Sequence, residues 1–163
     1  MRRLWAPWRM AYITGTGGPK ERGCIFCVKP KQRRDAANRI LCRGETAFAM
    51  MNLFPYNNGH LMIAPYRHIG DLTKLTPAEL LEMMTLAQAC QRAIAGCMRP
   101  DGFNLGCNLG RTAGAGIAGH GHLQLVPRWN GDTNFMPVLG GTKVISESLE
   151  SSFRKIKSHL TLP

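Results

Sequence analysis

Apolar and polar positions along the chain follow two spacings, which predict two kinds of element. Short apolar runs bounded by glycine, proline, asparagine or charged residues predict strands at 39–42, 46–52, 60–65, 101–108 and 120–126. The first two runs are separated only by Arg43-Gly44-Glu45, which predicts a β-hairpin. Because the third run follows a turn-forming segment, the three together predict an antiparallel meander.

Spacings of three and four predict one long helix that begins after Thr76. The Thr76 hydroxyl can cap the exposed amides, Pro77 suits the first turn, and Glu79 completes a capping box. Apolar residues then recur at Leu80, Met83, Met84, Ala87, Cys90 and Ile94, and the pattern ends near Gly96. We assign this face, including the Cys90 thiol, to the core and not to a cofactor. A weaker amphipathic pattern predicts a second helix over 146–159.

Strands and helices are segregated along the chain, which favours an α+β fold with an antiparallel sheet over a doubly wound α/β sheet. With 163 residues and 44% apolar content, the chain is expected to form one domain. We expect an N-terminal arm and mobile loop over 1–23 and the domain itself over 24–163. No apolar run approaches the roughly 20 residues that span a bilayer, and the first residues lack the apolar run of a secretory signal. The expected location is the cytoplasm.

Charge and cysteine usage narrow the classes of ligand. The chain has 21 basic and 10 acidic residues, a net charge of +11, and this field attracts anionic ligands, of which phosphates are the natural class. A pI near 9.9 also fits nucleic acid, and charge alone does not separate a nucleotide from a polynucleotide. The six cysteines are expected to be reduced thiols, because a chain of this size with an ordinary core does not need disulfides.

Two histidines and a glutamine alternate in the last predicted strand. His120, His122 and Gln124 are therefore expected to share one face, directly after a glycine-rich loop over 109–119. Bare backbone amides in such a loop can approach a phosphate, and a neutral imidazole is a good nucleophile towards phosphorus. Gln124 can donate to a phosphate oxygen. A lone strand histidine is more often structural than catalytic, so spacing alone leaves both roles open.

The segment His120-Gly121-His122-Leu123-Gln124-Leu125-Val126 resembles the signature of the histidine triad (HIT) superfamily, which is His-x-His-x-His followed by two apolar residues. Gln124 stands at the third histidine, as in the transferase branch that contains galactose-1-phosphate uridylyltransferase and the diadenosine tetraphosphate phosphorylases. Segments 4–9, 55–62 and 127–135 are similar to bacterial HIT proteins labelled hydrolases or ATP adenylyltransferases. The resemblance implies a HIT fold with about five antiparallel strands, one long helix and a C-terminal helix.

The resemblance also implies a mechanism. His122 would attack the α-phosphorus of a nucleotide substrate and form a covalent nucleotidyl-histidine. Water would then complete hydrolysis, whereas phosphate or a phosphorylated acceptor would complete transfer of the nucleotidyl group. His120 would belong to the same catalytic signature. Gln124 would hold a phosphate oxygen or the leaving group but, unlike histidine, cannot act as a general acid. The substitution therefore favours phosphoanhydride substrates with anionic leaving groups, or transfer chemistry.

Ligand-binding positions follow from the same resemblance. It implies nucleotide-binding roles for Asn52, His60, Asn108, Gly114, Ala115 and Gly116. Asn52 would hold the ribose hydroxyls, which is compatible with a second role as a turn residue. Asn108 and the glycine-rich loop would contact phosphate, with backbone donors supplying most of the contacts. His60 would support the site, and core packing accounts for it equally well.

A Cys-x-x-Cys pair at Cys24 and Cys27 is typical both of zinc sites and of redox dithiols. The sequence has no second such pair, so a four-ligand site must recruit histidines, and His68 and His120 are the candidates. The resemblance implies this same set, holding a structural zinc. It also implies a homodimer.

Three classes of function remain open at this stage, an enzyme, a nucleic-acid-binding module and a nucleotide-sensing regulator. The enzyme class holds two alternatives. The expected one is a nucleotidyl transferase or phosphorylase acting on a nucleotide or dinucleoside polyphosphate, and its enzymatic rival is a HIT hydrolase that uses water. A basic zinc module that binds nucleic acid would explain the net charge and the run over 29–34, but the aromatic residues do not interleave with basic ones as a stacking platform requires. A nucleotide-sensing regulator, inactive because of Gln124, is the third.

Overall fold

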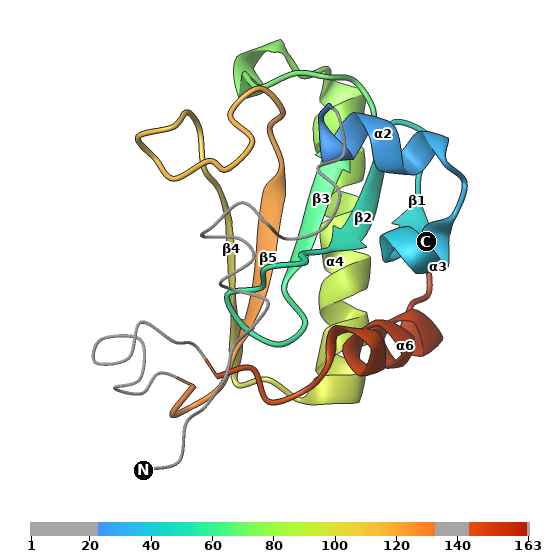
Figure 1. The fold of residues 1–163 in the computed structure, drawn as a ribbon, viewed down its shortest axis with the longest axis vertical. Helices are drawn as coiled ribbons and strands as arrows, with labels where there is room; N and C mark the ends of the chain where they lie inside the picture. The colour runs from blue at the N-terminus through green and yellow to red at the C-terminus, as the bar shows by residue number, and fades with distance from the viewer. Residues whose placement is uncertain (1–22, 133–143, 163) are drawn as a thin grey trace.

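The computed structural model describes residues 23–132 and 144–162, which form a five-stranded antiparallel sheet with helices on both faces (Figure 1). The strands are β1 (Ile40–Arg43), β2 (Ala47–Met51), β3 (Leu61–Pro65), β4 (Gly102–Cys107) and β5 (Leu123–Arg128), in the order β1-β2-β3-β5-β4. This confirms the α+β class, the hairpin and the meander. Nearly all of the arm expected over 1–23 lies outside the described residues, so the domain division stays a prediction.

The helices are α2 (Ile25–Lys31), α3 (Asp35–Asn38), α4 (Pro77–Met98) and α6 (Leu149–His159), with a short 3-10 helix η1 at Leu72–Lys74. Helix α4 begins at the predicted capping box, where the Thr76 hydroxyl accepts from the Glu79 amide at 3.2 Å and the Glu79 carboxylate accepts from the Thr76 amide at 2.8 Å. It continues past Gly96 to Met98, and Arg99, which has a left-handed φ of 47°, caps its C-terminus. Helix α6 starts after Ser148, whose hydroxyl accepts from the Ser151 amide. No helix in the described ranges is long and apolar enough to cross a bilayer.

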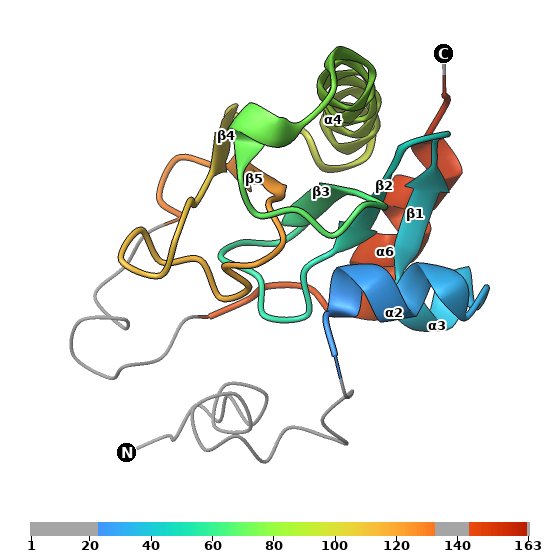
Figure 2. The same cartoon turned by 90° about the horizontal axis from the view of Figure 1, so that it is seen from above.

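The two faces of the sheet are covered differently. Helices α4 and α6 pack on one face, and α2 lies on the other, over β1 to β3 (Figure 2). Phe26 from α2 is fully buried there among Ile40, Phe48, Met50, Met62 and Ala64. Side chains alternate along β5, so Gln124 points away from α4 while Leu125 points towards it. On the α2 side, none of the described helices lies over the part of the sheet formed by β4 and β5 (Figure 2).

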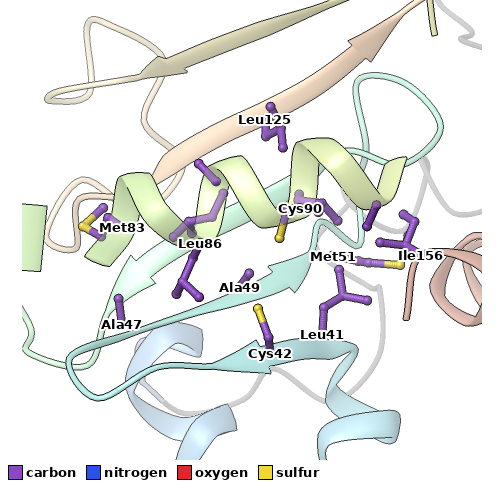
Figure 3. Close-up of a cluster of buried hydrophobic side chains, with 14 of the residues drawn as sticks. Leu41, Cys42, Ala47, Ala49, Met51, Met83, Leu86, Cys90, Leu125 and Ile156 are labelled. Carbon is purple, nitrogen blue, oxygen red and sulfur yellow. The ribbon is translucent and has the colours of Figure 1, made fainter. Parts of the chain in front are cut away.

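The larger core lies between the sheet and helices α4 and α6 (Figure 3). Met83 and Cys90 are buried in it, as predicted, and the Cys90 thiol faces that of Cys42 from β1 (Figure 3). Leu80 and Met84, expected on the same face, are instead each 44% exposed. The helix presents Leu86 to the sheet in their place, because its rotation is set by the strands it contacts.

Glu79 does more than cap α4. Its carboxylate also accepts from Arg67 Nε at 2.9 Å and from Arg67 Nη2 at 2.7 Å. The Arg67 guanidinium, and then the Thr76 amide, lower the pKa of Glu79 to about 2. Since Arg67 follows β3 and immediately precedes His68, the pair ties the segment that carries His68 to the first turn of α4.

Replacing Glu79 by glutamine tests this tie through its pH dependence. The folded-state pKa of about 2 lies below the ordinary value of 4.5, so the stabilisation is present above pH 4.5 and is lost as the pH falls from there towards 2. We expect Glu79→Gln to lower the free energy of unfolding by roughly 1–3 kcal/mol at pH 7, a difference that narrows towards pH 3. Urea unfolding at pH 7, 4.5 and 3 measures it, with the exposed Glu150→Gln on α6 as control. A constant difference at all three pH values would contradict the assignment.

Candidate active site and metal centre

Four side chains from three separate segments meet at one end of α2. Cys24 caps the helix and Cys27 lies in its first turn, His68 follows β3, and His120 precedes β5. Their ligand atoms all lie within 4.8 Å of one another. The Cys27 sulfur is 3.3 Å from His68 Nδ1, and the Cys24 sulfur is 3.4 Å from His120 Nδ1. The predicted ligand set is thus brought together as one cluster able to hold a metal ion.

The donor set and its spacing fit zinc. Zinc binds thiolate sulfur at about 2.3 Å and imidazole nitrogen at about 2.0–2.1 Å, so the edges of a tetrahedral site measure roughly 3.3–3.8 Å. The His68 and His120 Nδ1 atoms are 3.3 Å apart, and the Cys27 sulfur is 3.6 Å from His120 Nδ1. On the far side of its ring, His120 Nε2 lies 2.9 Å from the Pro65 carbonyl oxygen. A carbonyl only accepts, so Nε2 carries the proton and Nδ1 turns its lone pair towards the cluster.

Backbone contact between two loops holds the histidine ligands in place. The Gly121 amide donates to the Ile69 carbonyl at 2.7 Å. A Cβ atom added to Gly70 would lie 2.5 Å from the Ala118 carbonyl oxygen. The loop that carries His68 and the loop that carries His120 therefore touch without intervening side chains.

His122 is held as a neutral imidazole with a defined tautomer. Its side chain is only 7% exposed, and burial lowers its pKa. Its Nδ1 lies 3.1 Å from the His120 carbonyl oxygen, so Nδ1 carries the proton and Nε2 keeps its lone pair. The Phe26 ring packs against both imidazoles, at 4.7 Å from His122 and 5.1 Å from His120 between ring centroids. The arrangement suits a nucleophile or a base at Nε2.

The predicted histidine strand starts later than expected. Strand β5 begins at Leu123, so that only Gln124 of the three signature residues lies within it. The pairing with β3 ends at Ile63 and the pairing with β4 ends at Cys107, both opposite Leu123, which leaves the preceding residues no strand partner. The two imidazoles still lie on the same side, because both contact Phe26.

A cavity of about 330 Å³ opens along β4 and β5, with Gln124 and Asn108 among the residues that line it. His122 precedes Gln124 by two residues and is not among the residues that line the cavity. The sequence did not predict the other lining residues, among them Tyr56, Asn104 and Arg128. The alternation that pointed to Gln124 continues along the chain to residues 126 and 128, and this signal was available in the sequence.

The remaining predicted ligand residues organise the rim of this cavity. Asn52 accepts from the Phe54 amide at 2.9 Å, and its side-chain nitrogen lies 3.4 Å from His60 Nδ1. His60 is fully buried, accepts from the Tyr56 amide at 3.0 Å and stacks on the Tyr56 ring. These two residues therefore shape the turn that places Tyr56 at the cavity.

The glycine-rich loop is anchored at its start. Asn108 donates to the Gly114 carbonyl at 3.4 Å, and the Ala115 amide donates to the Gly110 carbonyl at 3.2 Å. Gly114 adopts a positive φ of 85°, a conformation that favours glycine, and Gly116 follows on the exposed part of the loop. The loop thus begins at the cavity and ends at the metal cluster, where it delivers His120.

The fold and the cluster define a class of α+β domain in which a metal-ligand set adjoins a buried histidine. A HIT domain family model matches residues 33–131. The chain is 40% identical over 161 residues to an AP-4-A phosphorylase of Mycobacterium tuberculosis, covering 94% of this chain and 82% of the relative. It is 30% identical over 95 residues to a bis(5'-nucleosyl)-tetraphosphatase [asymmetrical] of Schizosaccharomyces pombe, covering 58% of this chain and 52% of that protein. The chain belongs to the HIT family.

A solved structure supports the same assignment. The structure of a Zn-bound histidine triad family protein from Mycobacterium smegmatis superposes with a TM-score of 0.68 at 27% identity, covering 84% of this chain and 92% of that one. The family and the fold expected from the sequence are therefore confirmed.

Removal of the two thiols tests the metal cluster. We expect the purified protein to carry about one zinc ion per chain, and the Cys24→Ser/Cys27→Ser double variant to lose it, because two imidazoles alone do not complete a tetrahedral site. The free energy of unfolding should fall by at least about 3 kcal/mol. Elemental analysis and urea unfolding measure the two effects. The control is Cys97→Ser, whose thiol donates to the Ile94 carbonyl on α4. Equal metal content in both variants would exclude the cluster as a metal site.

Proposed function

We propose that this protein is a nucleotidyl transferase of the phosphorylase type, acting on a dinucleoside polyphosphate through a covalent nucleotidyl-His122 intermediate. The observation that carries the proposal is the hydrogen bond from His122 Nδ1 to the His120 carbonyl, which leaves the Nε2 lone pair available two residues before Gln124, a residue that lines the cavity. The AP-4-A phosphorylase that shares 40% identity over 94% of this chain gives the substrate class.

The chain's own residues account for both steps of the reaction. Nε2 of His122 attacks the α-phosphorus, the bond to the bridging oxygen breaks, and the leaving nucleotide departs as a polyphosphate anion. The imidazolium that forms keeps its Nδ1 proton on the His120 carbonyl. The Gln124 amide donates to a non-bridging oxygen. An oxygen of inorganic phosphate then attacks the same phosphorus and the P–N bond breaks, so that diadenosine tetraphosphate and phosphate yield ATP and ADP.

Zinc in the cluster of Cys24, Cys27, His68 and His120 would be structural, since four protein ligands leave no open position for substrate. His120 would then serve two purposes at once. Its imidazole would bind the metal, and its carbonyl holds His122. The site residues with nucleotide-binding roles remain Asn52, His60, Asn108 and the loop residues Gly114, Ala115 and Gly116, which lie around or lead away from the cavity.

Gln124 favours phosphorolysis over hydrolysis. An amide cannot protonate a leaving group, so the first step relies on a leaving group that is already stable as an anion, as a nucleoside polyphosphate is. Nor can an amide remove a proton from attacking water, whereas inorganic phosphate is an anionic nucleophile. The alternative is a HIT hydrolase that uses water. The similarity to a tetraphosphatase over 58% of the chain supports this alternative.

The edge of the sheet supports a homodimer. Strand β4 pairs only with β5 among the described strands, and Leu105 on it is 44% exposed. An open edge of unpaired backbone groups is a template for a second strand, and an antiparallel pair of β4 strands satisfies twofold symmetry. We infer that two copies join along β4, in the cytoplasm, and that nucleic acid is not a partner.

Phosphate dependence decides between the two enzymatic functions. Incubation with diadenosine tetraphosphate and inorganic phosphate should produce ADP and ATP, and omission of phosphate should abolish ADP formation. We expect His122→Ala to lower the rate by about 10³-fold or more, because the covalent step is lost. Anion-exchange chromatography separates the products, and His159→Ala on the exposed end of α6 is the control. AMP and ATP appearing at the same rate without phosphate would identify a hydrolase.

Exchange of Gln124 for histidine should open the route to water. An imidazole there can donate or accept a proton, so Gln124→His is expected to raise phosphate-independent AMP release by about tenfold or more. Gln124→Ala, which removes the amide donor, should lower phosphorolysis by roughly 10–100-fold without raising hydrolysis. An unchanged ratio of AMP to ADP in Gln124→His would show that this residue does not control the acceptor.

A further inference from the structure

We propose that Arg128 and Asn104 form a second phosphate-binding subsite, at the end of the cavity away from His122, which binds the part of the substrate that leaves in the first step. This inference rests on the proposed function and names the part of the substrate that the far end recognises. Neither residue was singled out by the sequence.

The subsite lies on the same face as Gln124, farther along the strand. Gln124 pairs with Gly106, and Arg128 pairs with Gly102, four residues farther along β5. At about 3.4 Å per residue these two pairs are roughly 14 Å apart. Gln124 and Arg128 line one cavity, together with Asn104 from β4. Its length exceeds what one phosphate group needs and suits an extended polyphosphate chain.

The Arg128 guanidinium is fixed before any ligand arrives. Its Nε and Nη2 donate to the two Asp132 oxygens at 2.6 and 2.8 Å, and its Nη1 donates to the Asn104 side-chain oxygen at 2.8 Å. Asp132 in turn accepts from the Asn57 side chain at 2.8 Å and from the Trp129 amide at 3.2 Å. A cation held from two elements loses little side-chain entropy when it binds an anion.

Donors remain for a ligand after these contacts. Guanidinium has five N–H donors, and the hydrogen bonds to Asp132 and Asn104 use three of them. Because the Asn104 oxygen faces Arg128, its NH₂ group is turned the other way. Arg128 is 44% exposed at its side chain and borders the cavity. The Asn104 oxygen thus orients the Arg128 guanidinium further, beyond its ion pair with Asp132.

The polar groups around the cavity match an anion. The described residues that line it include no aspartate or glutamate, and its polar side chains are amides, one phenol and the Arg128 guanidinium. Charge-assisted N–H donors are the strongest partners for phosphate oxygens. With the α-phosphate at Gln124, the far phosphates of the leaving nucleotide lie towards Arg128. The subsite then favours substrates with a long anionic leaving group.

Equilibrium binding tests the subsite independently of turnover. In a His122→Ala background, which prevents the covalent step, titration calorimetry compares diadenosine tetraphosphate with AMP, a probe too short to reach from Gln124 to Arg128. We expect Arg128→Gln to weaken binding of the tetraphosphate by about tenfold and that of AMP by less than about twofold. Asn104→Ala leaves the Arg128–Asp132 pair in place. It should weaken the binding of the tetraphosphate by about threefold or more and leave the binding of AMP unchanged. Arg154→Gln, an exposed charge on α6, is the matched control.

Each outcome decides the question. The subsite would be contradicted if Arg128→Gln weakened the binding of both ligands equally or of neither. It would also be contradicted if the protein with Arg128 bound the tetraphosphate no more tightly than AMP. Should Arg128→Gln shift the thermal unfolding midpoint, the comparison between ligands in Asn104→Ala decides alone. Failure of the proposed function has a different signature, since it appears as absence of nucleotide turnover by the unaltered protein, whereas failure of the subsite leaves that turnover intact.

Discussion

The position of one imidazole, that of His120, determines the rest of the site. Its Nε2 donates to the Pro65 carbonyl at the end of β3, which turns Nδ1 towards the thiols of Cys24 and Cys27. Its own carbonyl accepts from His122 Nδ1, which fixes the tautomer of the neighbouring ring. The metal cluster and His122 are therefore not two independent sites. A single residue, His120, connects them.

The asymmetry of the sheet explains why the chemistry lies where it does. One face is fully used for packing, since α4 and α6 bury it in the larger core. Among the described helices, only α2 and α3 lie on the other side, where Phe26 of α2 closes a smaller core over β1 to β3. Residues of β4 and β5 line the cavity, at the margin of this packed region. His122 lies next to this region, buried enough that its pKa is lowered.

The features of this structure that depend only on residues close together in the sequence could be predicted. The capping box at Thr76 and the hairpin around Gly44 are local, and both are present. The rotation of α4, which leaves Leu80 exposed, depends on which side chains the strands present. The start of β5 at Leu123 depends on where its partners end. Neither the rotation of α4 nor the first residue of β5 can be predicted from a short stretch of sequence.

The candidate site divides in the same way. The ligand set was predictable because the family resemblance supplied a pairing that spacing does not, with Cys24 and His120 lying 96 residues apart in the chain. Gln124 followed from alternation along one strand. The contact of Arg128 with Asn104 spans two strands, 24 residues apart, and depends on a register that no pattern within either strand encodes.

Gly70 shows how such an arrangement constrains the evolution of the sequence. Its backbone does not need the conformational freedom of glycine, since its φ lies outside the positive range. What excludes a side chain is the Ala118 carbonyl oxygen, 2.5 Å from where a Cβ atom would stand. Any heavier residue would require the opposite loop to retreat, and with it a metal ligand. A substitution of Gly70 therefore requires a compensating change near Ala118, about fifty residues away. We expect the sequences of the two loops to change together during evolution.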